Sequence, residues 1–184
     1  MSDPYSHLEA LGLQLISAGG PVGNFEPCVQ VGNLVFLSGQ GPRDHDGTLK
    51  TGKLGHTLSV EQGRSHAQLA GLNVLSMLHA QLGDLRRVRR IVRVLGMVNA
   101  IPDFEHHPAV INGASDLFVA VFDEAGRHSR TAVGMASLPF GISVEIEAIV
   151  EVSTPLFASK LSASTNWTEG RAGASGNSRR NLIA

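Results

Sequence analysis

Hydrophobic and polar positions follow a helical period in two parts of the chain. Between Ser59 and Gly83, apolar residues recur every three or four positions, which predicts one amphipathic helix. Its start is marked by Ser59 and Gln62, which stand in the S-x-x-Q pattern of a capping box. A second helix is expected at about residues 109–124, with Gly126 as its C-terminal stop.

Strands are predicted where the pattern changes to alternation. Residues 27–40 read PCVQVGNLVFLSGQ, which predicts a hairpin that turns at its Gly-Asn pair. Alternation returns in residues 86–99, 131–138 and 143–152. Residues 43–56 are rich in Gly, Asp, Thr and Lys, and we expect a loop or an irregular strand there. The order β-β-α-β-α-β-β, with a hairpin at each end, favours an α+β fold in which two helices back one face of a mixed sheet.

The chain's 184 residues fit one domain with a substantial core. The periodic segments lie within residues 21–152, which we assign to that domain, and residues 1–20 are assigned to an N-terminal extension. Residues 153–184 change composition, with Ser, Gly, Asn, Thr and Arg dominating from Ser159 onward. A flexible C-terminal tail is therefore expected.

Composition narrows the possible partners. The formal charge is −1 and the pI is about 6.7. The protein therefore lacks the strong positive potential that sequence-independent nucleic-acid binding needs, and nucleic acid is an unfavoured partner. The arginine-rich run at residues 86–93 could attract RNA, but no aromatic platform accompanies it. A solvated helix-to-strand turn whose arginines pair across a subunit boundary explains the run better. Cys28 stands alone and reads as a small buried hydrophobe. No signal-like start or membrane-length apolar run occurs, so we expect a cytoplasmic protein without a membrane partner.

Two residue types in the last two predicted strands suggest chemistry. Arg130 opens one strand, and its planar guanidinium suits bidentate binding of a carboxylate, although a surface arginine is the simpler interpretation from composition. Glu145 and Glu147 alternate with apolar residues in the next strand, which on the simple interpretation is a solvated face. If that face is buried against another subunit, its acids need partners or take raised pKa values. His106 and His107 are adjacent and do not share a helix face, so no metal site is expected.

Several motifs, in order, resemble the YjgF/RidA family, also known as L-PSP endoribonucleases. They are G-N-L-V-F-L-S-G-Q at 32–40, H-S-R-T-A-V at 128–133, L-P at 138–139 and V-E-I-E-A-I at 144–149. The resemblance covers about residues 21–152. The chain is more similar to one branch of the family, which has a longer Gly-rich loop and the motifs N-G-A-S-D-L, here at 112–117, and H-S-R-T-A-V-G.

The resemblance implies a chorismate-mutase-like fold and a homotrimer with a β-barrel core and clefts between subunits. In its deaminating members, an arginine at the place of Arg130 pairs with the substrate carboxylate, and a glutamate at the place of Glu145 positions the hydrolytic water. The resemblance also implies that five further residues bind the substrate: Phe25, Gly39, Asn112, His128 and Ala132. Two of these depart from the family pattern, because Phe25 stands where a tyrosine is usual and Ala132 stands where many members have a cysteine.

The implied reaction is hydrolysis of reactive 2-imino or 2-enamino acids to 2-keto acids and ammonia. Such imines are already electrophilic, so the site need only anchor a small carboxylate and hold one water, without a metal or other cofactor. The alternatives are a non-catalytic regulatory trimer that binds small carboxylates, which Phe25 favours, and an endoribonuclease, which the near-neutral charge disfavours.

Overall fold

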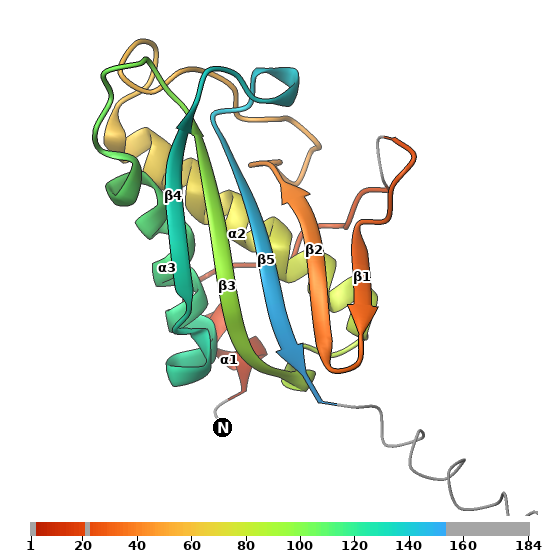
Figure 1. Cartoon of the computed structure of the whole chain (residues 1–184). Helices are drawn as coiled ribbons and strands as arrows, with labels where there is room; N and C mark the ends of the chain where they lie inside the picture. The colour runs from red at the N-terminus through yellow and green to blue at the C-terminus, as the bar shows by residue number, and fades with distance from the viewer. Residues whose placement is uncertain (1–2, 21–22, 154–184) are drawn as a thin grey trace, which may run out of the picture. The chain divides into compact units, whose positions relative to one another are not determined.

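One mixed β-sheet with helices behind it forms the part of this computed structural model that is described, residues 3–20 and 23–153 (Figure 1). The predicted tail, residues 153–184, lies outside the described residues from position 154 onward. The strands are β1 (Cys28–Val31), β2 (Leu34–Gln40), β3 (Val88–Asn99), β4 (Ser129–Met135) and β5 (Val144–Val152). The helices are α1 (Pro4–Ala10), α2 (Val60–Leu82) and α3 (His107–Phe122), with 3-10 turns η1 (Leu85–Arg87), η2 (Asp123–Gly126) and η3 (Pro139–Gly141).

The strands lie side by side in the order β1-β2-β5-β3-β4. The predicted N-terminal hairpin is confirmed, with β1 antiparallel to β2, but the predicted C-terminal hairpin is wrong because β4 and β5 are not neighbours. The helix α3 returns the chain to the starting end of β3, so β4 runs parallel to β3 along its outer edge. Strand β5 then runs antiparallel to both β2 and β3 and fills the space between them. The sheet is therefore mixed, as predicted.

Helices α2 and α3 pack against one face of the sheet and against each other (Figure 1). The predicted capping box of α2 is confirmed, since Ser59 Oγ accepts a hydrogen bond from Gln62 N at 3.3 Å and Gln62 Oε1 accepts one from Ser59 N at 2.9 Å. Glycine lets the helices approach closely, because a Cβ on Gly113 would overlap the backbone of α2 at Arg64. The core fills the space between these helices and the sheet, with Leu75, Phe118 and many aliphatic side chains fully buried.

The predicted N-terminal extension contains a short helix, α1, that the sequence pattern did not reveal. Its Leu8 is buried. The hydroxyl of Tyr5 accepts a hydrogen bond from Leu85 N at 2.8 Å, and the His7 ring lies 3.0 Å from the carbonyl of Val121. These contacts hold α1 against η1 and the end of α3.

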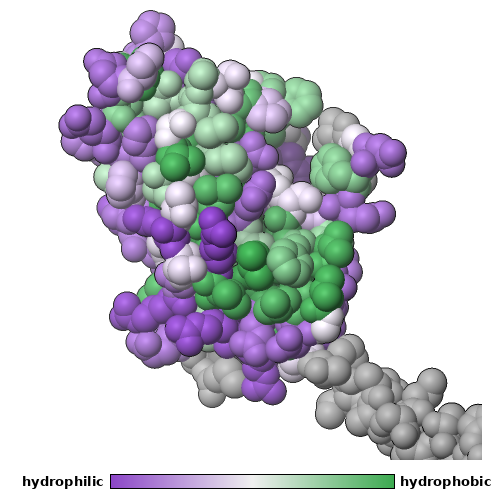
Figure 2. Space-filling view, in the orientation of Figure 1, coloured by the Kyte–Doolittle hydropathy of each residue, from purple (hydrophilic) through white to green (hydrophobic). Residues whose placement is uncertain are grey.

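The other face of the sheet has no helix over it in the described part of the chain, and we call it the open face. Figure 2 shows that apolar side chains gather there. These side chains come from all five strands and lie together on one face of the sheet. They are Val29, Phe36, Leu95, Met97, Val133, Met135 and Ile149. No helix within the described residues is long and apolar enough to cross a membrane.

Candidate functional site

Arg130 lies at the start of edge strand β4 and points toward α3. Its Nη1 donates hydrogen bonds to Asn112 Oδ1 at 2.8 Å and to Ser115 Oγ at 3.1 Å. Asn112 and Ser115 are three residues apart on α3, so one helix face presents both acceptors. The guanidinium is half-buried, and no acidic side chain pairs with it in residues 3–20 and 23–153. Its remaining N–H groups can therefore bind an anion from outside this chain.

His128 completes the group around Arg130, and we call Arg130, Asn112, Ser115 and His128 the Arg130 cluster. The ring Nδ1 lies 2.7 Å from the carbonyl of Gly126, which can only accept, so Nδ1 carries a proton. The ring Nε2 lies 3.0 Å from Ser115 Oγ. Burial, with the nearby Arg130 charge, lowers the pKa of His128, although the bond to Gly126 opposes this. The neutral ring thus accepts the Ser115 proton, which orients the Ser115 oxygen toward Arg130.

Glu145 lies in a different place, in a hollow of about 500 Å³ that we call the Glu145 hollow. Burial, and secondly the negative charge of Glu147, raise the pKa of Glu145 above its usual range. No hydrogen bond or ion pair to the Glu145 carboxylate is found among the described residues. A half-buried carboxylate of raised pKa and no partner has the properties of a general base.

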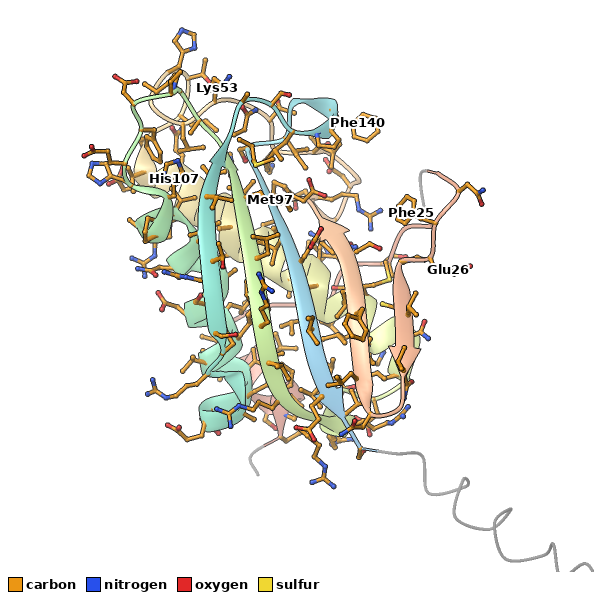
Figure 3. The ribbon with its side chains drawn as sticks, viewed as in Figure 1. Phe25, Glu26, Lys53, Met97, His107 and Phe140 are labelled. Carbon is orange, nitrogen blue, oxygen red and sulfur yellow. The ribbon has the colours of Figure 1, made fainter. Side chains whose placement is uncertain are left out.

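Two other predicted site residues line the Glu145 hollow. A Cβ on Gly39 would overlap the carboxylate oxygen of Glu145, so only glycine leaves room for that side chain in this position. Phe25 is 51% exposed and stands with Phe140 at the rim (Figure 3). The ring of Phe25 is therefore available to a ligand, but it offers no hydroxyl.

The chain does not bring the Arg130 cluster and Glu145 together. Arg130 is in register with Val94 on one side of β3, and Glu145 is in register with Met97 on the other. The Cα atoms of Arg130 and Glu145 are thus separated by three residues along the strand direction and by two strand spacings across the sheet. Together these displacements place the two Cα atoms roughly 14 Å apart. Arg130 also faces α3, as does the half-buried Ala132, whereas Glu145 is on the same side of β5 as the exposed Glu147. A small substrate cannot touch both residues of one chain.

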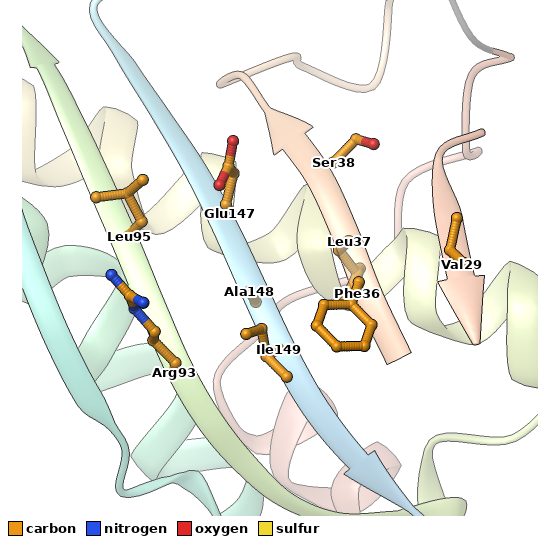
Figure 4. A pocket seen from close by; sticks show the side chains of 9 residues that line it. All are labelled: Val29, Phe36, Leu37, Ser38, Arg93, Leu95, Glu147, Ala148 and Ile149. Atoms are coloured by element: carbon orange, nitrogen blue, oxygen red, sulfur yellow. The ribbon is translucent and has the colours of Figure 1, made fainter. Parts of the chain in front are cut away.

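A shallow hollow of about 380 Å³ crosses the open face beside this region (Figure 4). Arg93 of β3 and Glu147 of β5 stand among the apolar side chains of Phe36, Leu95 and Ile149. Two opposite charges within an apolar surface can find partners if a second chain covers this face.

Other candidates from the sequence have structural roles. Burial raises the pKa of Cys28 to about 11, so its thiol stays protonated. His106 and His107 both pack edge-on against Phe104. Arg86 bonds to Asp3 and lies over the ring of Tyr5 within the same chain, so this arginine of the run has a partner without a second subunit. In the described part of the chain, no three His, Cys, Asp or Glu side chains are grouped to hold a metal ion.

Sequence reasoning missed two residues that the structure places in these sites. Ser115 joins His128 to Arg130, and its spacing from Asn112 in N-G-A-S-D-L was the available signal. Arg43 lines the Glu145 hollow, but it lies in the segment for which the sequence predicted only a loop or an irregular strand.

Comparison with known proteins identifies relatives along most of the chain. A family model described as "YjgF/chorismate mutase-like, putative endoribonuclease" matches residues 5–149. Protein TCP17 of Trypanosoma cruzi is 44% identical over 149 residues, which are 80% of this chain and 93% of that protein. A 2-iminobutanoate/2-iminopropanoate deaminase of Dermatophagoides farinae is 30% identical over 136 residues, which are 72% of this chain and 88% of that protein.

A solved structure from Shewanella oneidensis, titled a "putative endoribonuclease", has the same fold. Its TM-score is 0.79 at 35% identity, and the match covers 82% of this chain and 100% of that chain. The chorismate-mutase-like α+β fold expected from the motifs is thereby confirmed.

Proposed function

The chain belongs to the YjgF/chorismate mutase-like family, and on that premise we propose that it hydrolyses 2-imino or 2-enamino acids to 2-keto acids and ammonia. The family includes proteins named as imine deaminases and others named as endoribonucleases. The observation that carries the proposal is the Arg130 guanidinium, which Asn112 and Ser115 hold in place while no acid of the described chain neutralises it. Such a group is suited to anchor the carboxylate of an imino acid.

The proposed site is formed between two chains of a homotrimer. Arg130 of one chain supplies the anchor and Glu145 of its neighbour supplies the base, because the two residues of one chain face opposite sides of the sheet. The uncovered apolar open face supports self-association, since a sheet face of this kind is normally buried. The family relationship supports the same assembly.

The chemistry follows from these two groups. Arg130 holds the carboxylate, which fixes the imine carbon near a water bound at Glu145. The imine reacts in its protonated form, and Glu145 takes one proton from the water as the water oxygen bonds to the imine carbon, which gives a neutral carbinolamine. Glu145 then passes this proton to the amine nitrogen, the C–N bond breaks and ammonia leaves, and the hydroxyl proton is lost to solvent as the keto group forms. In this scheme Asn112, Ser115 and His128 position Arg130, while Gly39 and Phe25 shape the site around the imine.

We expect Glu145→Gln to lower kcat for imine hydrolysis by about 100-fold or more, since general-base catalysis contributes roughly 10²–10⁴. The imine is generated in the assay by an amino-acid oxidase, and keto acid and ammonia are followed. In the unaltered protein, kcat/KM should fall as pH drops through the pKa of Glu145, and this acid limb should lie above the usual glutamate value because the pKa is raised.

Stability provides the control for this variant. Folding raises the pKa of the Glu145 carboxyl group. The contribution of this group to stability is therefore fully present below the pKa that it has in the unfolded chain. That contribution is lost as the pH rises through the pKa that it has in the folded chain. Glu145→Gln should therefore leave the free energy of unfolding at pH 7 unchanged or higher. A variant that is folded and hydrolyses imines at the unaltered rate would rule out Glu145 as the base.

A further inference from the structure

Arg43 is a second arginine at the proposed site, and it lies in the same hollow as Glu145. It belongs to the G-P-R-D stretch of the glycine-rich loop, to which the proposed reaction assigns no role. Arg43 is half-buried, and together with Glu145 it is one of the two residues with ionisable side chains that line the described part of the hollow. A half-buried guanidinium needs a counter-charge or several hydrogen bonds.

One hydrogen bond and a close approach to Gly19 restrict the side chain of Arg43. Its Nη2 donates to the carbonyl of Ser17 at 2.9 Å, and a Cβ on Gly19 would come within 2.6 Å of its Nη1. Its own carbonyl accepts a hydrogen bond at 2.8 Å from Asn73, which is nearly fully buried on α2. A preorganised arginine loses little conformational entropy when it binds a ligand.

The charge of Arg43 has no acidic partner among the described residues. The adjacent acid, Asp44, is instead paired with Lys50 at 2.8 Å. Glu145 also forms no ion pair with Arg43, although both side chains line the same hollow. The guanidinium and the carboxylate are therefore both available to different groups of one ligand.

We propose that Arg43 binds a second carboxylate on the side chain of the substrate, so that the site takes 2-imino dicarboxylic acids. This inference rests on the proposed function, in which Arg130 of a neighbouring chain holds the first carboxylate and Glu145 faces the imine carbon. The side chain of the substrate then extends from Glu145 to Arg43 through the hollow.

The walls of the hollow suit the methylene groups of such a substrate. Met77, Phe140 and Ile142 supply apolar surface to the walls of the hollow that Arg43 and Glu145 also line. A volume of about 500 Å³ lies within the usual range of small-molecule sites and accommodates a five- or six-carbon diacid. Glu145 disfavours a second carboxylate at its own end, so the negative group is directed to Arg43.

A binding experiment tests the inference without turnover. Calorimetric titration compares 2-oxoglutarate, the keto diacid of a five-carbon substrate, with 2-oxopentanoate, which has the same chain length and one carboxylate. We expect 2-oxoglutarate to bind at least about 10-fold more tightly, and Arg43→Gln to remove this preference, since a charge-assisted hydrogen-bonded pair is lost. Arg43→Lys, which keeps the charge, should retain part of it.

Kinetics with the imines of glutamate and norvaline provide the second arm. Arg43→Gln should lower kcat/KM about 10- to 100-fold for the glutamate imine and less than about 2-fold for the norvaline imine. Arg64→Gln is the matched control, because Arg64 pairs with the exposed Asp116 between α2 and α3. Arg64→Gln should leave kcat/KM unchanged for both imines.

The outcomes separate this inference from the proposed function. If the protein hydrolyses the norvaline imine but shows no preference for the diacid in either assay, the role of Arg43 is rejected and the deaminase proposal stands. If Arg43→Gln weakens both ligands equally, Arg43 only holds the Ser17–Gly19 segment, and the inference again fails. If diacids bind in an Arg43-dependent way but no imine is hydrolysed, the binding site is supported and the deaminase proposal fails.

Discussion

Replacing Arg130 with alanine should lower kcat/KM for imine hydrolysis by about 100- to 1000-fold. Truncating one member of a partly buried charged pair costs about 2–5 kcal/mol, and each 1.4 kcal/mol is a factor of ten in rate. Arg130→Lys should recover little, because one ammonium cannot both bond to Asn112 and Ser115 and bind a carboxylate with two parallel hydrogen bonds. The oxidase-coupled assay measures both variants.

Arg127→Ala is the control for this prediction. Arg127 lies three residues away and forms an exposed ion pair with Glu124 at 2.9 Å, so its loss should leave the rate within about 2-fold. The assembly state of each variant is measured in the same samples. Unaltered turnover by a folded Arg130→Ala protein would reject Arg130 as the anchor.

Replacing Phe36 with aspartate should dissociate the proposed trimer and abolish imine hydrolysis, although Phe36 belongs neither to the Arg130 cluster nor to the lining of the Glu145 hollow. Phe36 is 40% exposed on the open face, where it is in register with Ile149. Covering an unpaired carboxylate with a second apolar surface costs several kcal/mol in every chain of an assembly. We expect a shift from trimer to monomer by analytical ultracentrifugation, with a loss of activity of at least about 100-fold.

Leu11→Asp provides the comparison, because Leu11 is similarly exposed at 46% but follows α1 on the helix side of the sheet. This variant should remain trimeric and active. A Phe36→Asp protein that stays trimeric would show that the open face is not the interface, and a fully active monomer would show that no second chain is needed.

Local patterns were sufficient to predict most elements of the fold. The capping box at Ser59 and the alternation in β5 are local features, and both were confirmed. Helix α1 was missed because its seven residues cover about two turns, too few for a periodic signal, although Asp3 and Pro4 are typical of a helix start.

Strand order could not be obtained from the same patterns. Alternation in β4 and β5 identifies two strands but not their neighbours, and the simplest assumption paired them as a hairpin. The helix before β4 places it parallel to β3, and the remaining free edges of β2 and β3 then receive β5. Pairing of this kind depends on edges formed by residues far apart in the sequence.

For the candidate site, the sequence indicated residues but not their geometry. Arg130 and Glu145 were selected through the family motifs and their roles stay predictions, whereas the alternation of the β5 acids with buried residues is confirmed. Alternation fixes which residues of one strand share a face, but it does not relate the faces of two separate strands. The sequence therefore gave no sign that Arg130 and Glu145 of one chain face opposite sides, which is the basis for a site between chains.

Mixing two inactive variants tests the central claim most directly. Arg130→Ala chains keep Glu145, and Glu145→Gln chains keep Arg130, so a site between unlike chains can contain both original residues. Coexpression should restore about one quarter of the original activity, since random assembly pairs the intact arginine with a neighbour's intact glutamate in that share of head-to-tail interfaces. No recovery in mixed trimers that contain both variants would contradict a site shared by Arg130 of one chain and Glu145 of the next.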